Sequence, residues 1–406
     1  MNKKMNIIYL HQYFSTPSMS SGTRSFEMAR RLVKSGHKVY MLSSRHTRSY
    51  KEKKYFTVED GIFVWWLPVQ YSNNMNYIMR LFSFIRYCYL AIIQARKIDY
   101  DIVFATSTPL TIAIPGILLS KLNKTPFILE IRDLWPELPI AIGALRSQFS
   151  IYLAKLLERW SYDNADHIIG LSEEMCAKIE MNGQPEDKIS NIPNGCDIDL
   201  FNVKIEKGIE FRNKYDWLGP NPLVIYTGAL GKMNNVIFLV EIADYMKKLN
   251  SDIRFLIIGK GKEEKIIFDY AKKLGVLDNN LFIIRELTKN YLVNIYSAAS
   301  VCTSLFMPLK EMEANSANKF FDALAAGKPL MINYKGWQAK LIEKYNAGIV
   351  VPSDNVSIAA KELEALIVDE KRLFSTGKAA KELAIKHFDR DKLYKSFENV
   401  FLSVSN

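Results

Sequence analysis

The sequence feature that most limits the possible folds is a pattern of strand, loop, helix and strand that occurs twice along the chain. Its first copy runs from the apolar segment Met5 to Leu10, through a helical stretch at Arg24 to Ser35, to a second apolar segment at Lys38 to Ser43. A second copy starts after Asn194-Gly195 with the strand-like Leu223 to Thr227. Alternating strands and helices are typical of parallel sheets covered by helices. The sequence therefore predicts an α/β fold with two Rossmann-like domains.

The length of the chain agrees with two domains. A chain of 406 residues, 49% of them hydrophobic, exceeds what one hydrophobic core usually organises. We expect an N-terminal domain over residues 1–200 and a C-terminal domain over residues 201–387. Because open parallel sheets bind ligands beyond the carboxyl ends of their strands, two such domains facing each other would hold a ligand in the cleft between them.

Charge, cysteines and hydropathy narrow the class of protein. The net charge of +11 favours anionic partners such as nucleotide phosphates or phospholipid headgroups, and no zinc-finger, RRM-type or basic-zipper pattern indicates nucleic acid. The four cysteines show no CxxC spacing, which fits a reducing cytosol. No apolar segment approaches the roughly 20 residues that cross a bilayer, and the N-terminus has no signal-peptide pattern. We expect a cytoplasmic protein.

A glycine-containing loop follows the first strand of each predicted domain. Gly22 lies within Ser20 to Arg24, and Gly228 and Gly231 precede Lys232. Glycine lets a ligand approach the backbone, a helix N-terminus offers N–H groups to an anion, and an ammonium supplies charge. The loops predict contacts to a diphosphate, with Lys232 as its cation. The alternatives are an ordinary capped loop and a tight turn with a solvated lysine.

Charged residues end a predicted buried strand of the first domain. Arg132 and Asp133 follow the apolar segment Pro126 to Ile131 and precede a Trp-Pro corner. Burying such charges without a partner is costly, so their position at the carboxyl end of a strand indicates function. Arg132 would hold a phosphate or a sugar hydroxyl, and Asp133 would orient the acceptor or the donor sugar. The alternative is a structural Arg–Asp pair.

A polar loop opens a helix of small residues in the segment Asn315 to Pro329. The N–H groups of the first helical turn, at Asn318, and the ammonium of Lys319 make an anion site. Asp322 lies one turn further along and would reach the hydroxyls of a ribose. The alanine-rich remainder is explained by close helix packing, with Gly327 as the C-terminal cap.

Two other motifs are interpreted as structural. Gly259-Lys260-Gly261 lacks the third glycine of a dinucleotide fingerprint and indicates a turn before a helix. Asp197-Ile198-Asp199 resembles a metal-binding DxD, but no further carboxylate or histidine spacing completes a site for a hard cation. We expect a linker turn at this point and no metal.

The helical stretch Asn76 to Lys97 mixes aromatic and basic residues. Aromatic rings settle at the membrane interface and cations meet anionic headgroups there, so this composition suits a membrane surface. The alternative is a core helix packed on its sheet. We expect the core role for most of the helix and membrane contact along one edge.

Together these motifs resemble glycosyltransferase family 4, retaining enzymes of the GT-B fold, and in particular its bacterial branch of N-acetyl-L-fucosamine transferases of surface polysaccharide synthesis. The resemblance covers nearly the whole chain, and its most specific segments are Arg132 to Glu137, Ile192 to Asp197, Gly228 to Lys232, and Asn318 to Pro329. It implies that the C-terminal domain binds a nucleotide-diphosphate sugar without a metal, and that the final segment 388–406 returns to the N-terminal domain.

The resemblance extends the donor site and also shows departures from the family pattern. It adds the loop residue Leu230, the base-proximal segment Arg285, Glu286 and Leu287, and Glu313. The family has two glutamates separated by seven residues; here Asp322 takes the second position and Ala314 the first, with Glu313 adjacent. An arginine usual in the phosphate loop is Ala229, which leaves Arg285 or Lys319 as substitutes. A histidine that many relatives carry near Arg132-Asp133 is also absent.

We therefore expect retaining transfer of a sugar, of the N-acetylated amino or deoxy type, from a UDP or GDP donor. The expected acceptor is a lipid-linked saccharide of O-antigen or capsule synthesis, on the inner face of the cytoplasmic membrane. Two alternatives stay open at this point. One is a nucleotide-sugar epimerase of the same fold, and the other is a nucleotide-sugar-binding protein without catalysis.

Overall fold

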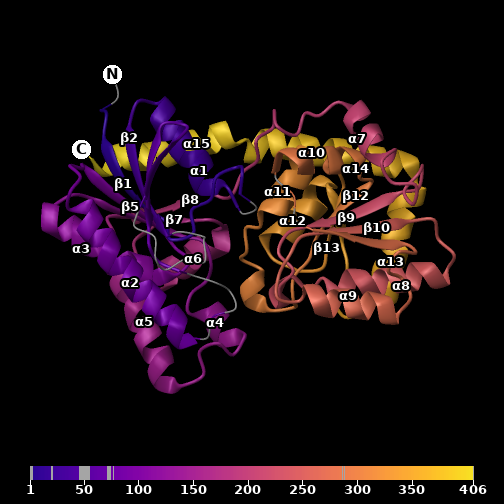
Figure 1. Cartoon of the computed structure of the whole chain (residues 1–406), viewed down its shortest axis with the longest axis horizontal. Helices are drawn as coiled ribbons and strands as arrows, with labels where there is room; N and C mark the ends of the chain where they lie inside the picture. Colours follow the sequence, from indigo (N-terminus) through magenta and orange to yellow (C-terminus); the bar gives the residue numbers. More distant parts are fainter. Residues whose placement is uncertain are drawn as a thin grey trace.

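Two parallel sheets organise the chain, each in its own half of the molecule (Figure 1). The computed structural model describes residues 3–19, 22–44, 55–70, 75, 77–285, 287 and 289–405. In this part of the chain the first sheet has eight strands in the order β3-β4-β2-β1-β5-β6-β7-β8, and the second has six in the order β11-β10-β9-β12-β13-β14. All neighbouring strands pair in parallel except β3 and β4. The predicted α/β class with two Rossmann-like domains is confirmed.

The first half contains the following elements. The strands are β1 (Asn6–Leu10), β2 (Lys38–Ser44), β3 (Tyr55–Glu59), β4 (Ile62–Leu67), β5 (Ile102–Thr106), β6 (Phe127–Ile131), β7 (His167–Gly170) and β8 (Ile189–Asn191). The helices are α1 (Arg24–Lys34), α2 (Tyr77–Ala95), α3 (Ala113–Asn123), α4 (Glu137–Ala141), α5 (Gln148–Asp163) and α6 (Glu173–Met181).

The second half and the C-terminus contain the remaining elements. The strands are β9 (Leu223–Thr227), β10 (Arg254–Ile258), β11 (Leu281–Ile284), β12 (Val301–Ser304), β13 (Leu330–Ile332) and β14 (Gly348–Val350). The helices are α7 (Ile205–Arg212), α8 (Ile237–Lys248), α9 (Glu264–Lys273), α10 (Lys289–Ala298), α11 (Asn318–Ala325), α12 (Trp337–Tyr345), α13 (Val356–Val368), α14 (Glu370–Leu383) and α15 (Arg390–Val404).

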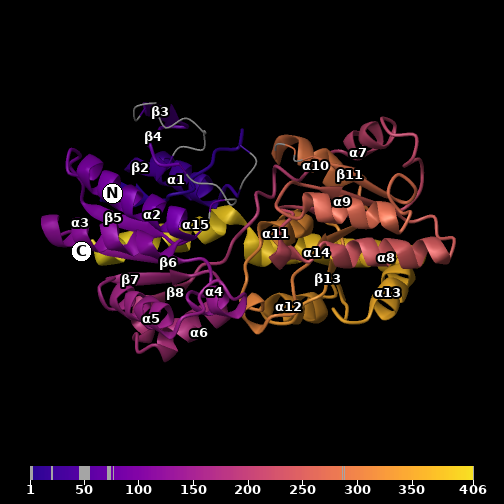
Figure 2. The ribbon, with the colours of Figure 1, turned by 60° about the horizontal axis from the view of Figure 1, so that its bottom comes forward.

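Each face of the first sheet is covered by a layer of helices. Helices α2, α3 and α5 pack on one face, and α1 and α15 pack on the other. The C-terminal helix α15 therefore lies against the first sheet although it follows the second one in sequence, as Figures 1 and 2 show. The rings of Phe397 and Phe401 lie 5.3 and 5.4 Å from that of Phe104 in β5. These buried aromatic contacts hold the end of the chain on the N-terminal half.

Both sheets reverse their strand order beside their first strand, between β1 and β5 in the first sheet and between β9 and β12 in the second. Loops that leave such a point turn to opposite faces of the sheet and leave a crevice beyond the carboxyl ends of the strands. The fold thus provides two crevices, and the residues that follow these strands are the ones placed to meet a ligand.

The chain crosses between the halves twice, near Cys196 and near Phe388, and the two crossing segments are hydrogen-bonded to each other. The Cys196 N–H donates to the Phe388 carbonyl at 2.9 Å, and the Arg390 N–H donates to the Cys196 carbonyl at 3.1 Å. The Asp197 carboxylate beside them pairs with the guanidinium groups of Arg31 and Arg390. Asp197 therefore belongs to an ion-pair network at the junction. Among the described residues, no three His, Cys, Asp or Glu side chains are grouped so that they could hold a metal ion.

A second ion pair fixes the entrance to helix α1. Arg24 and Glu130 are both buried, and the guanidinium donates to Glu130 Oε1 at 2.8 and 3.0 Å. Arg24 also donates to the carbonyls of Ile192 and Pro193, and Glu130 Oε2 accepts a bond from Thr106. Burial acts to raise the pKa of Glu130, but the Arg24 charge and hydrogen bonds outweigh it and hold that pKa below its usual range. The pair ties the first helix, strand β6 and the passage between the halves together.

Candidate functional site

A cavity of about 1510 Å³ lies between the two halves, where the carboxyl ends of both sheets meet. Part of its lining comes from the carboxyl ends of strands of the second sheet and the loops that follow them: Thr227 to Ala229 at the end of β9, Ile258 to Lys262 at the end of β10, and Phe306 in the loop after β12. The first half contributes Met19, Gly22, Thr23, Asp133 and Leu138. The ligand cleft expected between two facing sheets is therefore present.

Two glycine loops form the floor of this cavity by packing backbone against backbone. The Gly228 N–H donates to the Ile258 carbonyl at 3.0 Å, and the Leu230 N–H donates to the Lys260 carbonyl at 2.9 Å. A Cβ atom at Gly259 would collide with the Gly228 carbonyl, so a side chain there would force the loops apart. Gly228 itself has φ +146°, a conformation that favours glycine. The loops leave a smooth backbone surface that a phosphate can approach closely.

Lys319 supplies the buried cation of the cavity. It stands in the first turn of α11, and its ammonium donates to Asn234 Oδ1 at 2.7 Å and to the Tyr226 hydroxyl at 3.3 Å. The ammonium also lies 4.6 and 4.7 Å from the ring centres of Tyr226 and Phe306. Among the described residues, no carboxylate forms an ion pair with it. Burial lowers the pKa of Lys319 to about 7. A buried ammonium held only by neutral groups is an attractive site for an anion.

Several predicted donor residues lie around Lys319. Gly22, Gly228, Asn318, Asp322 and Leu287 all line the large cavity. Ala317 occupies the N-cap position of α11 and gives no side-chain cap, and Ala317, Asn318 and Lys319 at this end of the helix line the cavity, whereas the Phe320 N–H donates to the Ala317 carbonyl. The structure thus brings the first-domain glycine and the helix-terminal motif to one place, although about 300 residues of sequence, as counted from their numbers, separate them.

Other predicted donor residues are placed elsewhere. The side chain of Lys232 is exposed and does not line the cavity, nor do Gly231 and Glu313. Leu230 is fully buried in the core under the loops. The Arg285 side chain is 90% exposed, with its Nε 3.9 Å from Glu264 Oε1. Of the two substitutes considered for the missing arginine, the structure therefore places Lys319 and not Arg285 in the cavity. Glu286, like Ser20, Ser21 and Asn76, lies outside the described residues.

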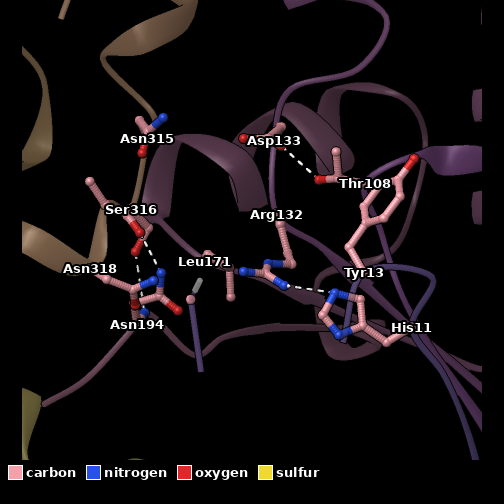
Figure 3. A pocket seen from close by; sticks show the side chains of 12 residues that line it. His11, Tyr13, Thr108, Arg132, Asp133, Leu171, Asn194, Asn315, Ser316 and Asn318 are labelled. Atoms are coloured by element: carbon pink, nitrogen blue, oxygen red, sulfur yellow. Dashed lines mark hydrogen bonds between the residues drawn. The ribbon is translucent and has the colours of Figure 1, made fainter. Parts of the chain in front are cut away.

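A smaller cavity of about 250 Å³ adjoins the large one (Figure 3), and both are lined by Gly22, Asp133, Asn315, Ala317 and Asn318. Figure 3 shows Arg132 pointing towards His11, with Arg132 Nη1 and His11 Nε2 3.4 Å apart. Asp133 accepts a hydrogen bond of 2.8 Å from the Thr108 hydroxyl. These polar groups follow β1, β5 and β6, so they lie at the crevice of the first sheet. The volume and the polar lining suit a sugar ring.

Hydrogen bonds between the two halves lie beside this smaller cavity. The Asn194 N–H donates to Ser316 Oγ at 3.2 Å, and the Asn194 side-chain amide donates to the Ser316 carbonyl. Nearby, the Ser172 hydroxyl donates to the Ala314 carbonyl at 2.8 Å. Ala314 is buried against Leu171 and Met175. The position of the family's first glutamate therefore lies inside an apolar contact between the halves.

The structure also adds residues that the sequence did not indicate. His11 directly follows β1 and supplies an imidazole beside Arg132, where the sequence near Arg132-Asp133 contains no histidine. Lys260 and Lys262 line the large cavity, although their loop was interpreted only as a turn. The signal for all three was their position in a loop that follows a strand of an open parallel sheet, rather than any motif.

Two family models match the chain and together cover most of it. A model described as a glycosyl transferase 4-like domain matches residues 21–195, and one described as glycosyl transferases group 1 matches residues 209–383. The chain is a glycosyltransferase of the GT-B type, built from these two domains, and it uses a nucleotide sugar as co-substrate.

Named relatives match at low identity. WcaI of Escherichia coli (strain K12), a protein named for glycosyl transfer in colanic acid biosynthesis, is 20% identical over 97% of this chain and 99% of its own length. A GDP-mannose-dependent alpha-(1-6)-phosphatidylinositol monomannoside mannosyltransferase of Mycobacterium tuberculosis (strain ATCC 25618 / H37Rv) is 22% identical over 71% of this chain and 72% of its own length.

Solved structures share the fold over the whole chain. Sucrose-phosphate synthase from Thermosynechococcus elongatus has a TM-score of 0.81 at 15% identity, covering 98% of this chain and 99% of that one. HepE from Anabaena, solved with UDP and glucose, has a TM-score of 0.74 at 16% identity, covering 98% of this chain and 100% of that one.

Proposed function

We propose that this glycosyltransferase moves a sugar, with retention at the anomeric carbon, from a UDP-sugar to a lipid-linked saccharide in the synthesis of a surface polysaccharide. The observation that carries the proposal is the buried ammonium of Lys319 beside the Gly228 loop, at the crevice of the second sheet. Residues 201–387 form the donor domain in this account. Residues 1–200, with the returning segment 388–406, form the acceptor domain.

The donor diphosphate would lie on the Gly228 backbone and the first turn of α11, with Lys319 as its principal cation. Asp322 would accept hydrogen bonds from the ribose, and Leu287 would lie near the base. UDP is favoured because HepE, which shares the fold, was solved with UDP and glucose. The mannosyltransferase relative is named as GDP-mannose-dependent, so GDP is the competing base. The transferred sugar, proposed to be an N-acetylated amino or deoxy sugar, would occupy the smaller cavity.

In the proposed reaction the bond between the anomeric carbon and the diphosphate oxygen breaks while the acceptor hydroxyl attacks from the same face. The proton of that hydroxyl passes to the departing phosphate oxygen. Lys319 and the α11 N–H groups stabilise the negative charge that develops on the diphosphate, and preorganised charge of this kind supplies much of the acceleration. Asp133 and Arg132 would orient the sugar and the acceptor. None of these steps needs a metal ion.

A lipid-linked acceptor accords with several observations. The chain carries a net charge of +11, and helix α2 exposes apolar side chains, among them Phe82 at 67%. None of the described helices is both long enough and apolar enough to cross a membrane, so contact with lipid would be peripheral. The name of WcaI places that relative in polysaccharide synthesis. The proposed acceptor is thus a saccharide carried on a lipid at the inner face of the membrane.

A transfer assay tests the proposal. The purified protein, with EDTA present, is incubated with individual UDP- and GDP-sugars and with lipid-diphosphate-linked saccharides. The account predicts acceptor-dependent release of UDP and a product with the anomeric configuration of the donor. A donor whose sugar is converted to its epimer in the absence of acceptor would contradict the account and favour an epimerase.

The affinity for the UDP-sugar should fall as the pH rises above about 7. Burial lowers the pKa of Lys319 to about 7, and a bound diphosphate favours its charged form. Below this pH the Lys319 amine is already protonated in the free protein, so the affinity for the UDP-sugar changes little with pH. Above it, binding must take up a proton, and affinity falls by up to about tenfold per pH unit. Calorimetric titrations in buffers of different ionisation enthalpy measure both the affinity and the proton. A flat profile between pH 6 and 9 would contradict this role.

Arg132→Met should lower kcat about a hundredfold while UDP affinity stays within about threefold of the wild type. The guanidinium lines the smaller cavity and not the larger one, so it would act on the sugar or acceptor in the transition state and not on the nucleotide. Steady-state kinetics and calorimetry measure the two quantities. An equal loss in both would place Arg132 on the diphosphate instead.

A further inference from the structure

Helix α5 carries large apolar side chains on the side that faces water. Phe149, Tyr152, Leu153, Leu156 and Trp160 are all exposed, Phe149 at 71%. At about 100° per residue they fall within one stripe roughly 100° wide. The buried side chains lie on the opposite side of the helix and include Ala154, Glu158, Ser161 and Tyr162. A surface helix normally presents polar residues to water, so this stripe calls for an apolar environment outside the fold.

The neighbouring helices continue the apolar surface. Helix α3 packs against both α2 and α5 and exposes Leu118 and Leu122. Helix α2 exposes a matching stripe of Phe82, Ile85 and Tyr89. Figure 1 shows these three helices on the N-terminal half, away from the donor domain. We call the exposed side chains of α2, α3 and α5 the outer apolar surface.

The charges on and around the outer apolar surface are mainly positive. Exposed cations flank each stripe: Arg86, Arg96 and Lys97 by α2, Lys121 and Lys124 by α3, and Arg146, Lys155 and Arg159 by α5. Neither α2 nor α3 contains an Asp or Glu. The exposed carboxylates beside the surface are Asp99 and Asp101, which follow Lys97, and Asp163 of α5, whose Oδ2 lies 3.8 Å from Arg159 Nε; Glu158 of α5 is buried. The surface is therefore complementary to a negatively charged partner.

We propose that α5, with α3 and α2 beside it, docks the enzyme onto a membrane that contains anionic lipid, with the α5 stripe entering the interface. Aromatic and aliphatic side chains flanked by Lys and Arg suit a lipid headgroup region, whereas the cores of protein interfaces are depleted in Lys. The proposal rests on the lipid-linked acceptor proposed above, and it makes α5, which no sequence motif indicated, the principal contact.

The test compares vesicle binding of matched variants. One variant replaces Phe149, Tyr152 and Leu156 of α5 by serine. Its control replaces Phe374 and Val368 of the second half by serine; these two side chains are also exposed, at 77% and 72%. Cosedimentation is measured with vesicles of phosphatidylcholine alone and of phosphatidylcholine with phosphatidylglycerol. We expect the wild type and the control to bind the anionic vesicles, less so as salt rises, and the α5 variant to partition at least tenfold more weakly. Equal partition of the α5 variant and the wild type would overturn the proposal.

Two further measurements complete the test. Circular dichroism and transfer to a short-chain, water-soluble acceptor should be unchanged in the α5 variant, so that its loss of vesicle binding is not a loss of fold or of catalysis. Absence of transfer by the wild type would contradict the proposed function while leaving the vesicle result intact.

The oligomeric state gives a further outcome. If the wild type is a dimer, the α5 variant is a monomer and vesicle binding is unchanged, then the outer apolar surface is an interface between copies and the membrane proposal is overturned.

Discussion

Replacing Lys319 by Met is expected to weaken UDP binding at least a hundredfold and to lower kcat/KM by at least as much. The ammonium is buried at the crevice of the second sheet, and among the described residues its contacts there are with neutral groups. In the proposed complex it pairs with the diphosphate in a dry site, and losing one partner of a buried charged pair costs about 2–5 kcal/mol. Methionine fills the space of the lysine stem without a charge, so the fold should be retained.

Lys232→Ala is the matched control for Lys319→Met. The Lys232 side chain is exposed and lies outside the cavity lining, so water screens its charge. We expect a loss of at most about tenfold in UDP affinity. Calorimetry on both variants decides between the two lysines: a hundredfold loss for Lys232→Ala with near-normal binding by Lys319→Met would move the diphosphate away from the site described here.

Replacing Arg24 by Met is expected to lower the free energy of unfolding by about 3–5 kcal/mol, because it leaves the buried Glu130 carboxylate without its counter-charge. The pH dependence has a definite sign. The folded-state pKa of Glu130 lies below its ordinary value of 4.5, so the stability from the pair is present above that value and is lost as the pH falls through the folded pKa. The deficit of the variant should therefore be largest near neutral pH.

Arg30→Met provides the comparison on the same helix. Arg30 also pairs with a glutamate, Glu27, at 2.6 Å, but its side chain is 39% exposed. Partly exposed pairs contribute little, so we expect a loss below about 1 kcal/mol. Denaturant unfolding at pH 7 and at pH 4 measures both variants. Equal losses for Arg24→Met and Arg30→Met would show that the buried pair does not hold the junction as described.

The fold was predictable because its strands are buried on both faces. The continuous apolar segment Leu223 to Thr227 matches β9 residue for residue. Two strands were not predicted. β3 is an antiparallel edge strand with three exposed residues, and β7 has only four residues and begins with His167. Neither gives the sustained apolar signal of a central strand.

The candidate site was predictable only where chemistry and position coincide within a short segment. Arg132-Asp133 and Asn318-Lys319 each combine a charge with the end of a strand or the start of a helix, and both line a cavity. The meeting of His11 with Arg132 depends on the order of β1, β5 and β6 in the sheet, which no local pattern contains. Which of Lys232 and Lys319 supplies the cation of the large cavity likewise depends on which side chain reaches that cavity, and no local sequence pattern contains this information.

The thermal stability of the purified protein in EDTA shows whether a metal-independent site for a nucleoside diphosphate lies beside Lys319. Melting is recorded with UDP, GDP, CMP, their common sugar conjugates and NAD, for the wild type and for Lys319→Met. We expect UDP and UDP-sugars to raise the Tm of the wild type, because a ligand that binds only the folded state stabilises it, and we expect the shift to disappear in Lys319→Met. If no nucleoside diphosphate shifts the Tm, or if NAD alone does, the protein has no such site beside Lys319.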